Sequence, residues 1–497
     1  MSTSDDPAPG ADAAPANDPG PGPGTRDVGI TLSGGGHRAT VFGLGALLAV
    51  ADAGLRERTT SIGSVSGGSI ANGAVMIGPD FGTAPAAEIE AHIARTVKSI
   101  AERGILQGGA PATKWYLRAL LASIALAAIA LLVAVVAGIL EAPVVVGVGF
   151  ALFLTFGAVT LWLFSRRSAA TERAIDKELL GDARTSLADQ RDRDLSVHHV
   201  ICTTDMQGGT TFYFSNRMVY GWEFGGTTRP ASVPLSTAVQ ASACVPGAFR
   251  ARVVGLDALS LTPGTLTPDD HPPHGDVTVD RIVIVDGGVY DNMADSWEYG
   301  FGNRAGRWRG LGDAQANGAR QLVVVNASSD WNSLRPMPSG GLRFELDSLI
   351  RSKDVQYDVS TSHRRQALGR SFIDDDNDLD GVFVQIKDSP YRLVDIFTAK
   401  PGWTPGDKNR WADEARGFLD GYGLSAAEWK KIADASSAVA TTLKPLGTAV
   451  CASLLEHGYM LAMANMHVIF GHGDMTRSVD RARFTRLARG ETGGGGA

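Results

Sequence analysis

Ser66 stands in the segment SVSGG, residues 64–68, with small residues two positions before it and two positions after it. A nucleophile elbow needs small residues there, because a strand and a helix pack closely around a strained bend. Ser64 replaces the first glycine of the usual G-x-S-x-G pattern and is small enough for such a bend. A helix-capping serine is the alternative when the segment is considered alone. The spacing predicts Ser66 as a candidate nucleophile, with the amide of Gly67 beside it.

A second stretch, SGGGHR at residues 33–38, has three consecutive glycines after an apolar segment. Glycines leave backbone amides unshielded, and such amides near a helix N-terminus can bind an anion or a developing oxyanion. The stretch is not a Walker loop, because no Gly-Lys-Ser/Thr follows, and it lacks the spacing of a dinucleotide fingerprint. A plain strand-to-helix turn is the other interpretation of these glycines.

A third stretch, IVIVDGGVYDN at residues 282–292, ends an apolar run at Asp286 and continues with two glycines. The Asp286 carboxylate should project at the carboxyl edge of a sheet, where ligands and catalytic groups of open α/β sheets gather. Alone, Asp-Gly-Gly is typical of a turn. Taken in order, the glycine loop, the serine bend and this aspartate indicate a serine hydrolase whose base is a carboxylate.

The elements that must position these residues show the pattern of an α/β fold, since a strand, a glycine-rich turn and a helix occur twice in succession. We predict strands at residues 27–32, 59–65, 198–204, 281–286, 320–327 and 381–386. Helices are expected at residues 39–54, 69–78, 344–368, 405–419 and 426–469, the last broken near Pro445. The pattern predicts a parallel α/β sheet with helices against it.

This combination resembles the patatin-like phospholipase family, over residues 28–288. A further segment, residues 238–254, is similar to the A-S-x-A-x-P-x-x-F block of that family and contains Ser242, Pro246 and Phe249. The resemblance implies a three-layer sandwich with a mainly parallel central sheet. It also implies hydrolysis of phospholipid or lysophospholipid esters, without a cofactor or a metal.

By the same resemblance, Ser66 attacks the ester carbonyl, and Asp286 takes the serine proton directly with no histidine between them. The resemblance also assigns an oxyanion hole, formed by Gly34, Gly35, Gly36, His37, Arg38 and Gly67. Within it, Arg38 has two expected roles, stabilising the loop or binding a phosphate.

Two alternatives to a serine–aspartate dyad remain. An α/β-hydrolase would use a Ser-Asp-His triad, and His363, His457 and His467 follow in a suitable order. A membrane scaffold could instead keep a hydrolase fold without chemistry, because fold alone never proves activity.

Residues 113–167 predict a transmembrane helical hairpin inserted into the catalytic domain, which occupies residues 27–112 and 168–475. Two apolar runs, residues 119–140 and 144–164, are each long enough to cross a hydrocarbon core of about 30 Å. A buried hairpin in a soluble core is the alternative. Four basic residues flank the two apolar runs where the hairpin joins the domain: Lys114, Arg118, Arg166 and Arg167. By the positive-inside rule, the start and the end of the hairpin should therefore both face the cytoplasm.

The composition of the chain narrows its partners. The 497 residues carry a formal net charge of −7, which does not favour nucleic acid. Membrane lipids are the expected partner because the hairpin, through residues 119–164, would keep the domain at the bilayer surface. Three widely spaced cysteines fit a reducing compartment. The acidic loop at residues 374–381 begins like a calcium loop, but Lys387 occupies its twelfth position, which favours a solvated loop. Residues 1–26 and 476–497 are expected to be flexible tails.

Overall fold

The centre of the fold is a ten-stranded mixed sheet. The computed structural model describes residues 26–105, 111–181, 184–221, 223–228, 232–261, 279–301, 319–328, 341–373, 379–399 and 406–492. Five neighbouring strands are parallel, in the order β10 (Asp380–Gln385), β9 (Gln321–Asn326), β1 (Val28–Leu32), β2 (Thr59–Ser64) and β3 (His198–Asp205). All six predicted strands are present, and the predicted parallel sheet is confirmed for these five.

The remaining strands make the sheet mixed, because each pairs antiparallel with its neighbour. Beyond β3 lie β4 (Thr210–Ser215), β5 (Val219–Gly221) and β6 (Gly225–Thr227). A branch from the end of β3 adds β8 (Arg281–Asp286), which pairs with β7 (Arg252–Gly255). The strand that ends at Asp286 is therefore held directly on β3.

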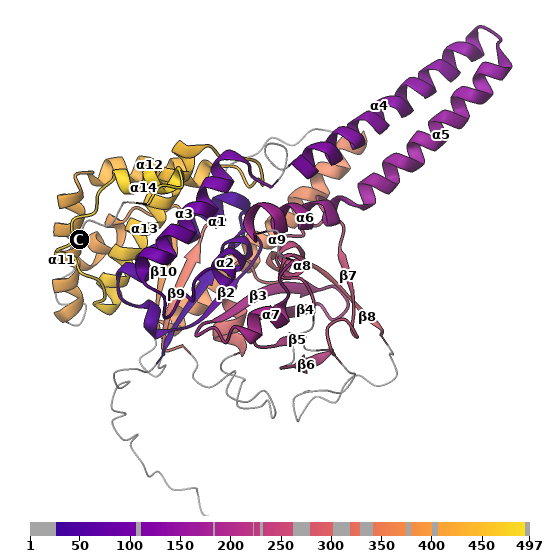
Figure 1. Cartoon of the computed structure of the whole chain (residues 1–497). Helices are drawn as coiled ribbons and strands as arrows, with labels where there is room; N and C mark the ends of the chain where they lie inside the picture. Colours follow the sequence, from indigo (N-terminus) through magenta and orange to yellow (C-terminus); the bar gives the residue numbers. More distant parts are fainter. Residues whose placement is uncertain are drawn as a thin grey trace, which may run out of the picture.

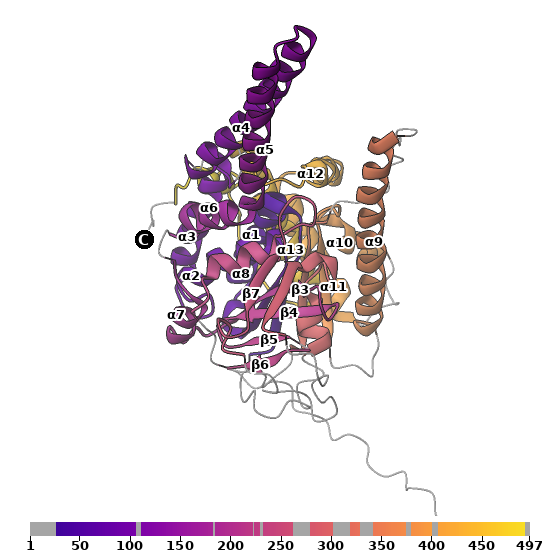
Figure 2. The same ribbon diagram turned by 90° about the vertical axis from the view of Figure 1, so that its right-hand side faces the viewer.

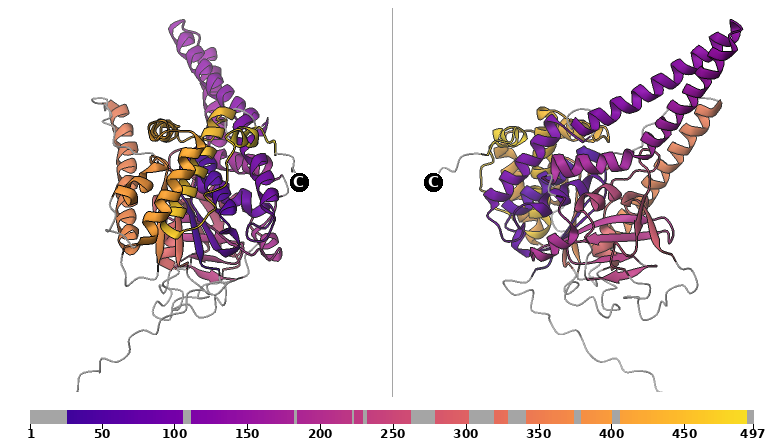
Figure 3. Two further views of the ribbon diagram at one scale, coloured as in Figure 1. Left: turned by 90° about the vertical axis from the view of Figure 1, so that its left-hand side faces the viewer. Right: turned by 45° about the vertical axis from the view of Figure 1, so that its right-hand side comes forward.

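Helices cover both faces of the sheet, and the alternation of side chains along β9 shows the two layers. Val323 and Val325 belong to the main core, whereas Leu322 and Val324 pack with Leu368 of α9 (Gly341–Ser371) on the opposite face. The main core includes α1 (Gly36–Asp52), α2 (Gly67–Ile77), α3 (Ala86–Glu102) and α13 (Thr448–Phe470). Figures 2 and 3 show α9 standing along one side of the molecule.

Close packing of α1 on α13 depends on glycine. A Cβ at Gly45 would lie 2.3 Å from the carbonyl oxygen of Leu455, and one at Gly458 would lie 2.2 Å from that of Phe42. The two helix backbones therefore touch without intervening side chains. Shorter helices complete the two layers and the C-terminal lobe: α6 (Arg167–Leu179), α7 (Leu187–Asp192), α8 (Leu235–Ser242), α10 (Tyr391–Ala399), α11 (Gly406–Tyr422), α12 (Ala426–Ala438) and α14 (Ala482–Ala488).

The inserted hairpin consists of α4 (Pro111–Ile139) and α5 (Pro143–Ser165), which project from the domain as an arm (Figure 1). Both helices are long and apolar enough to cross a membrane, with mean hydropathies of 2.9 and 2.3, and their most apolar windows are only 17% and 6% buried. The helices meet along small residues, since a Cβ at Gly149 would lie 3.0 Å from the Cβ of Ala134.

The C-terminal segment differs from the predicted flexible tail. Helix α14 buries Phe484 and Leu487, and Arg483 forms ion pairs with Asp52 at 2.7 Å and with Glu90 at 2.5 Å. These buried contacts order α14, which lies within the segment that was predicted to be a flexible tail. The first 25 residues, the histidines within residues 271–276 and the start of the acidic loop lie outside the described residues.

Candidate active site

Ser66 lies at a sharp bend between β2 and α2. Its backbone adopts φ 52° and ψ −116°, a positive φ that is uncommon for residues other than glycine and is typical of strained functional positions. The chain turns from strand to helix within two residues, because β2 ends at Ser64 and α2 begins at Gly67. The predicted bend is therefore present, with Ser66 at its apex. Ser64 takes the place of the usual glycine, and its buried hydroxyl is satisfied because it donates to the carbonyl of Val200 at 2.9 Å.

The glycine loop packs directly against this bend. Leu32 of β1 pairs with Ser64 of β2, so the two strands leave the sheet at the same edge. A Cβ at Gly67 would lie 2.2 Å from the carbonyl oxygen of Gly36, and one at Gly34 would lie 3.2 Å from the Cβ of Ser66. Backbone meets backbone here, so a side chain at Gly67 has no room.

Asp286 lies beside the serine bend, because β8 pairs with β3 just beyond the point where β2 ends. Ser64 of β2 pairs with Ile201 of β3, and Asp286 pairs with Thr203, two residues further along the same edge of β3, since β4 occupies the opposite edge. Ser66 lies two residues beyond Ser64, so it and Asp286 stand at the same level of the sheet. The turn after Asp286 also touches the serine bend, since a Cβ at Gly287 would lie 3.0 Å from Cγ2 of Val65. The Oδ1 atom of Asp286 accepts the Gly288 amide at 2.8 Å.

One short segment holds both residues. The hydroxyl of Ser242, at the end of α8, accepts the backbone N–H of Ser66 at 3.0 Å and donates to the carbonyl of Cys202 at 2.6 Å. Two residues later, the carbonyl of Cys244 accepts the backbone N–H of Asp286 at 3.1 Å. Residues 242–244 thus tie the serine bend to the aspartate. The A-S-x-A-x-P block was the sequence signal for this segment, although its spacing gave no hint of these contacts.

The amides of the glycine loop are not all available to an oxyanion. The Gly34 amide donates to the carbonyl of Asn292 at 3.1 Å, and the His37 amide donates to that of Thr442 at 2.8 Å. Both amides are therefore engaged, which removes them from the predicted oxyanion donors. The amides of Gly35, Gly36 and Gly67 have no acceptor within the described ranges.

The Arg38 side chain holds the loop in place. Its Nε donates to the carbonyl of Ala327 at 3.0 Å, and its Nη1 donates to that of Val439 at 2.6 Å. Burial lowers the pKa of Arg38 to about 10. Of the two roles expected for Arg38, these contacts favour stabilisation of the glycine loop. The guanidinium donates to backbone carbonyl oxygens and not to an anion.

The side chain of His37 is buried and neutral. Burial lowers its pKa to about 4, against an opposing hydrogen bond from Nδ1 to the carbonyl of Lys444 at 2.8 Å. A carbonyl can only accept, so Nδ1 carries the proton. His37 and Arg38 together fasten the glycine loop to the polypeptide between α12 and α13.

The histidines considered for a triad are engaged elsewhere. Nε2 of His457 lies 2.9 Å from the carbonyl oxygen of Asp388, and burial lowers the pKa of His457 to about 4. Nε2 of His467 lies 2.9 Å from Oε2 of Glu414. His363 is exposed on α9. In the part of the chain that the structure describes, none of the three hydrogen bonds to Ser66 or Asp286.

A buried ionic cluster follows Asp286 in the chain. Arg364 of α9 contacts both carboxylate oxygens of Asp295 at 3.0 Å and approaches Asp291 at 3.4 Å. Burial, together with the neighbouring Asp291, raises the pKa of Asp295 to about 8. The cluster fixes the segment that carries Asn292, whose carbonyl holds Gly34. Sequence reasoning missed this cluster because its members are 69 residues apart along the chain.

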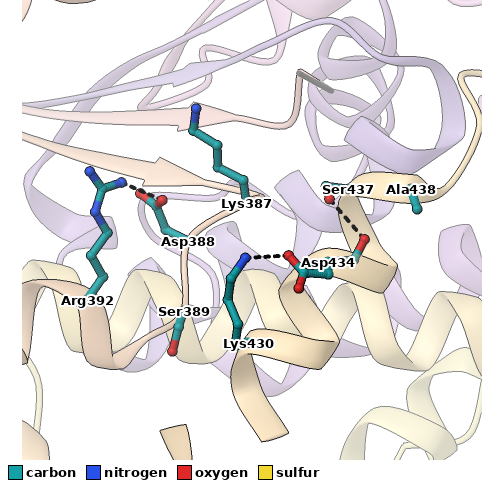
Figure 4. Close-up of a pocket in the computed structure, with 8 residues that line it drawn as sticks. All are labelled: Lys387, Asp388, Ser389, Arg392, Lys430, Asp434, Ser437 and Ala438. Carbon is teal, nitrogen blue, oxygen red and sulfur yellow. Dashed lines mark hydrogen bonds and ion pairs between the residues drawn. The ribbon is translucent and has the colours of Figure 1, made fainter. Parts of the chain in front are cut away.

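A cavity of about 590 Å³ lies beyond the end of β10, and Figure 4 shows its lining. Its charged side chains pair with one another, Arg392 with Asp388 and Lys430 with Asp434. Neither Ser66 nor Asp286 lines it. Within the described ranges, no three His, Cys, Asp or Glu side chains gather as metal ligands would.

Comparison with known proteins identifies the family. The family model described as patatin-like phospholipase matches residues 30–294, more than half of the chain. Among solved structures, human GIVD cytosolic phospholipase A2 is 12% identical with a TM-score of 0.36, and the match covers 66% of this chain and 48% of that one. VipD from Legionella pneumophila is 13% identical with a TM-score of 0.26, covering 72% and 61% of the two chains.

The matches thus span about half to three fifths of the solved relatives' own length. No curated protein matches the chain. The chain belongs to the patatin-like phospholipase family.

Proposed function

We propose that this protein is a membrane-anchored serine acyl hydrolase that cleaves carboxylic esters of phospholipids or lysophospholipids, with Ser66 as nucleophile and Asp286 as base. The observation that carries the proposal is the meeting of the ends of β2 and β8 along one edge of β3, which puts the two residues at the same level, with both backbones tied to residues 242–244. A strained serine bend beside a carboxylate is the arrangement that an activated nucleophile requires.

In the first half of the reaction, Oγ of Ser66 attacks the ester carbonyl and its proton passes to the Asp286 carboxylate. The amides of Gly35, Gly36 and Gly67 hold the oxygen of the tetrahedral intermediate, at the positive end of the α2 dipole. Collapse of the intermediate expels the alcohol, which takes the proton from Asp286. Water then attacks the acyl-serine, again giving its proton to Asp286, and the fatty acid leaves as Ser66 recovers its proton.

The hairpin supplies the anchor in this proposal, and residues 27–112 and 168–475 form the catalytic domain that it interrupts. Its apolar side chains are largely exposed, and aromatic rings at its base stack with cations, as they do at membrane interfaces. The guanidinium of Arg118 lies 5.6 Å from the Trp115 ring centre, and that of Arg166 lies 5.4 Å from the Trp162 ring centre. Basic residues at both ends favour a catalytic domain on the cytoplasmic side.

Lipid profiling with purified protein tests the function. Wild-type protein in vesicles should release fatty acid from phospholipid or lysophospholipid, and Ser66→Ala and Asp286→Asn should abolish this release. Single replacement of His363, His457 and His467 by Gln separates the mechanisms, because a dyad retains activity in each variant. Loss of activity in one folded histidine variant would support a triad, and an inactive wild type would support a scaffold.

A further inference from the structure

We propose that the loop of residues 245–249, between α8 and β7, is a membrane-contact loop that keeps the mouth of the Ser66 site on the bilayer surface. Acyl substrates would then reach Ser66 from the leaflet rather than from the aqueous phase. The inference rests on the proposed function and adds the route by which substrate arrives. Its partner is the acyl-lipid surface of the bilayer.

The loop begins at the segment that holds the site. Cys244, whose carbonyl accepts the Asp286 amide at 3.1 Å, immediately precedes it. The Sγ of Cys244 also lies 2.9 Å from the carbonyl oxygen of Arg250, so the two ends of the loop are closed on each other. The loop is therefore fixed beside Asp286.

The same loop is fastened to the base of the hairpin. Nε of Arg167 donates to the carbonyl of Ala248 at 3.0 Å, and the hydroxyl of Ser168 donates to that of Arg250 at 2.7 Å. Arg167 lies two residues beyond the end of α5, and its guanidinium is 4.0 Å from the centre of the Phe164 ring. In Figure 1 the hairpin leaves the domain from the side that carries α6 and α8. If α5 spans a bilayer, Ala248 stands at its interface.

The chemistry of the loop suits an acyl surface. Residues 245–249 read VPGAF and contain no charge, and Pro246, Gly247 and Ala248 are exposed. The turn after Asp286 adds the exposed side chains of Val289, at 38%, and Tyr290, at 39%, an aliphatic group and an amphipathic ring of the kind that membrane interfaces favour. An uncharged surface that gathers in water next to a carboxylate is unfavourable unless something covers it. Continuity with the hairpin base makes the bilayer the surface that does so.

A fluorescent probe at residue 248 tests the contact without relying on activity. The three native cysteines are buried, so Ala248→Cys offers an accessible thiol for an environment-sensitive dye. In proteoliposomes, phospholipid carrying a spin label near its headgroup should quench this dye, whereas aqueous iodide should not. Ala87→Cys is the matched control, since Ala87 is exposed in the first turn of α3, at the end remote from α4. Its dye should respond to iodide alone.

Iodide quenching without lipid quenching at residue 248 would overturn the proposal. Loss of both kinds of quenching, together with a dimeric mass in detergent, would identify a second copy as the partner and would also overturn it. The outcome is independent of the proposed chemistry, which Ser66→Ala tests separately.

A second measurement asks whether the contact matters for turnover. In the same proteoliposomes, Ala248→Asp should lower phospholipid hydrolysis on the order of tenfold relative to hydrolysis of soluble p-nitrophenyl butyrate, because a charge is unfavourable at an acyl surface. Ala87→Asp should leave this ratio unchanged. An equal loss on both substrates would mean that the loop acts through Asp286 instead of through the membrane, and an unchanged ratio would remove the role in turnover.

Discussion

Replacing Ser242 by alanine tests how the serine bend is held. The Ser242 hydroxyl accepts the Ser66 amide at 3.0 Å, lies 2.8 Å from the hydroxyl of Ser69 and donates to the carbonyl of Cys202 at 2.6 Å. All of these groups are buried. Ser242→Ala therefore leaves the Ser66 N–H without an acceptor at the residue that carries the strained backbone.

The magnitude follows from these contacts. A buried donor left unsatisfied costs about 1–3 kcal/mol, and each of the two further lost hydrogen bonds about 1 kcal/mol, so Ser242→Ala should lower the free energy of unfolding by about 3–5 kcal/mol. A strained backbone position stores about 1–3 kcal/mol. If relaxation of Ser66 forfeits that pre-organisation, kcat/KM falls about 10- to 100-fold.

Ser69→Ala is the matched control, because it removes a hydroxyl from the same network without leaving a donor unpaired. The Ser69 hydroxyl lies 3.1 Å from that of Ser64, whose own proton goes to the carbonyl of Val200. We expect Ser69→Ala to cost about 1 kcal/mol in stability and to keep kcat/KM within about threefold. Hydrolysis of p-nitrophenyl butyrate and thermal unfolding report both quantities. The reasoning is refuted if Ser242→Ala retains wild-type kcat/KM, or if both variants lose activity equally.

Three further predictions concern packing and pH. Gly67→Ala should abolish ester hydrolysis and lower Tm, because its methyl group would lie 2.2 Å from the Gly36 carbonyl oxygen. The control is Gly417→Ala on α11, where a methyl group meets open space, and this variant should keep activity and be slightly more stable. Burial raises the pKa of Glu298 to about 7, so its stabilising contribution is present below pH 4.5 and lost as pH rises through 7. Glu298→Gln should therefore gain up to about 3 kcal/mol at pH 8 and less at pH 5, measured by denaturant unfolding; an equal gain at both pH values contradicts this. Burial lowers the pKa of four histidines to about 3–4, namely His37, His199, His457 and His472. Because these imidazoles take up protons more readily in the unfolded chain, wild-type Tm should fall steeply from pH 6.5 to 4. A flat profile of Tm against pH would argue against neutral buried imidazoles.

The parallel half of the fold was predictable because its signals are local. A central parallel strand is buried on both faces and reads as a continuous apolar run, as β9 does from Leu322 to Val325. The bend at Ser66 was likewise visible, since small neighbours within two residues decide whether a strand and helix can pack around it. Helix α14 was missed because its burial of Phe484 depends on contacts with distant helices.

The supports of the site could not be predicted for the same reason. Ser242 reaches the Ser66 amide across 176 residues, and Arg38 reaches Val439 across 401. Whether a glycine amide is available to an oxyanion depends on such partners: Gly34 and Gly35 look alike in sequence, yet only Gly34 is engaged by Asn292 among the described residues. Sequence spacing identifies candidate donors, and tertiary contacts decide which of them are occupied.

The site of covalent labelling tests the central claim most directly. Wild-type protein treated with a fluorophosphonate probe and digested for peptide mass spectrometry should carry the label on Ser66. Asp286→Asn should slow labelling strongly while leaving Tm close to the wild-type value. A label on Ser64 or Ser69, or a labelling rate indifferent to Asp286→Asn, would contradict the proposed dyad.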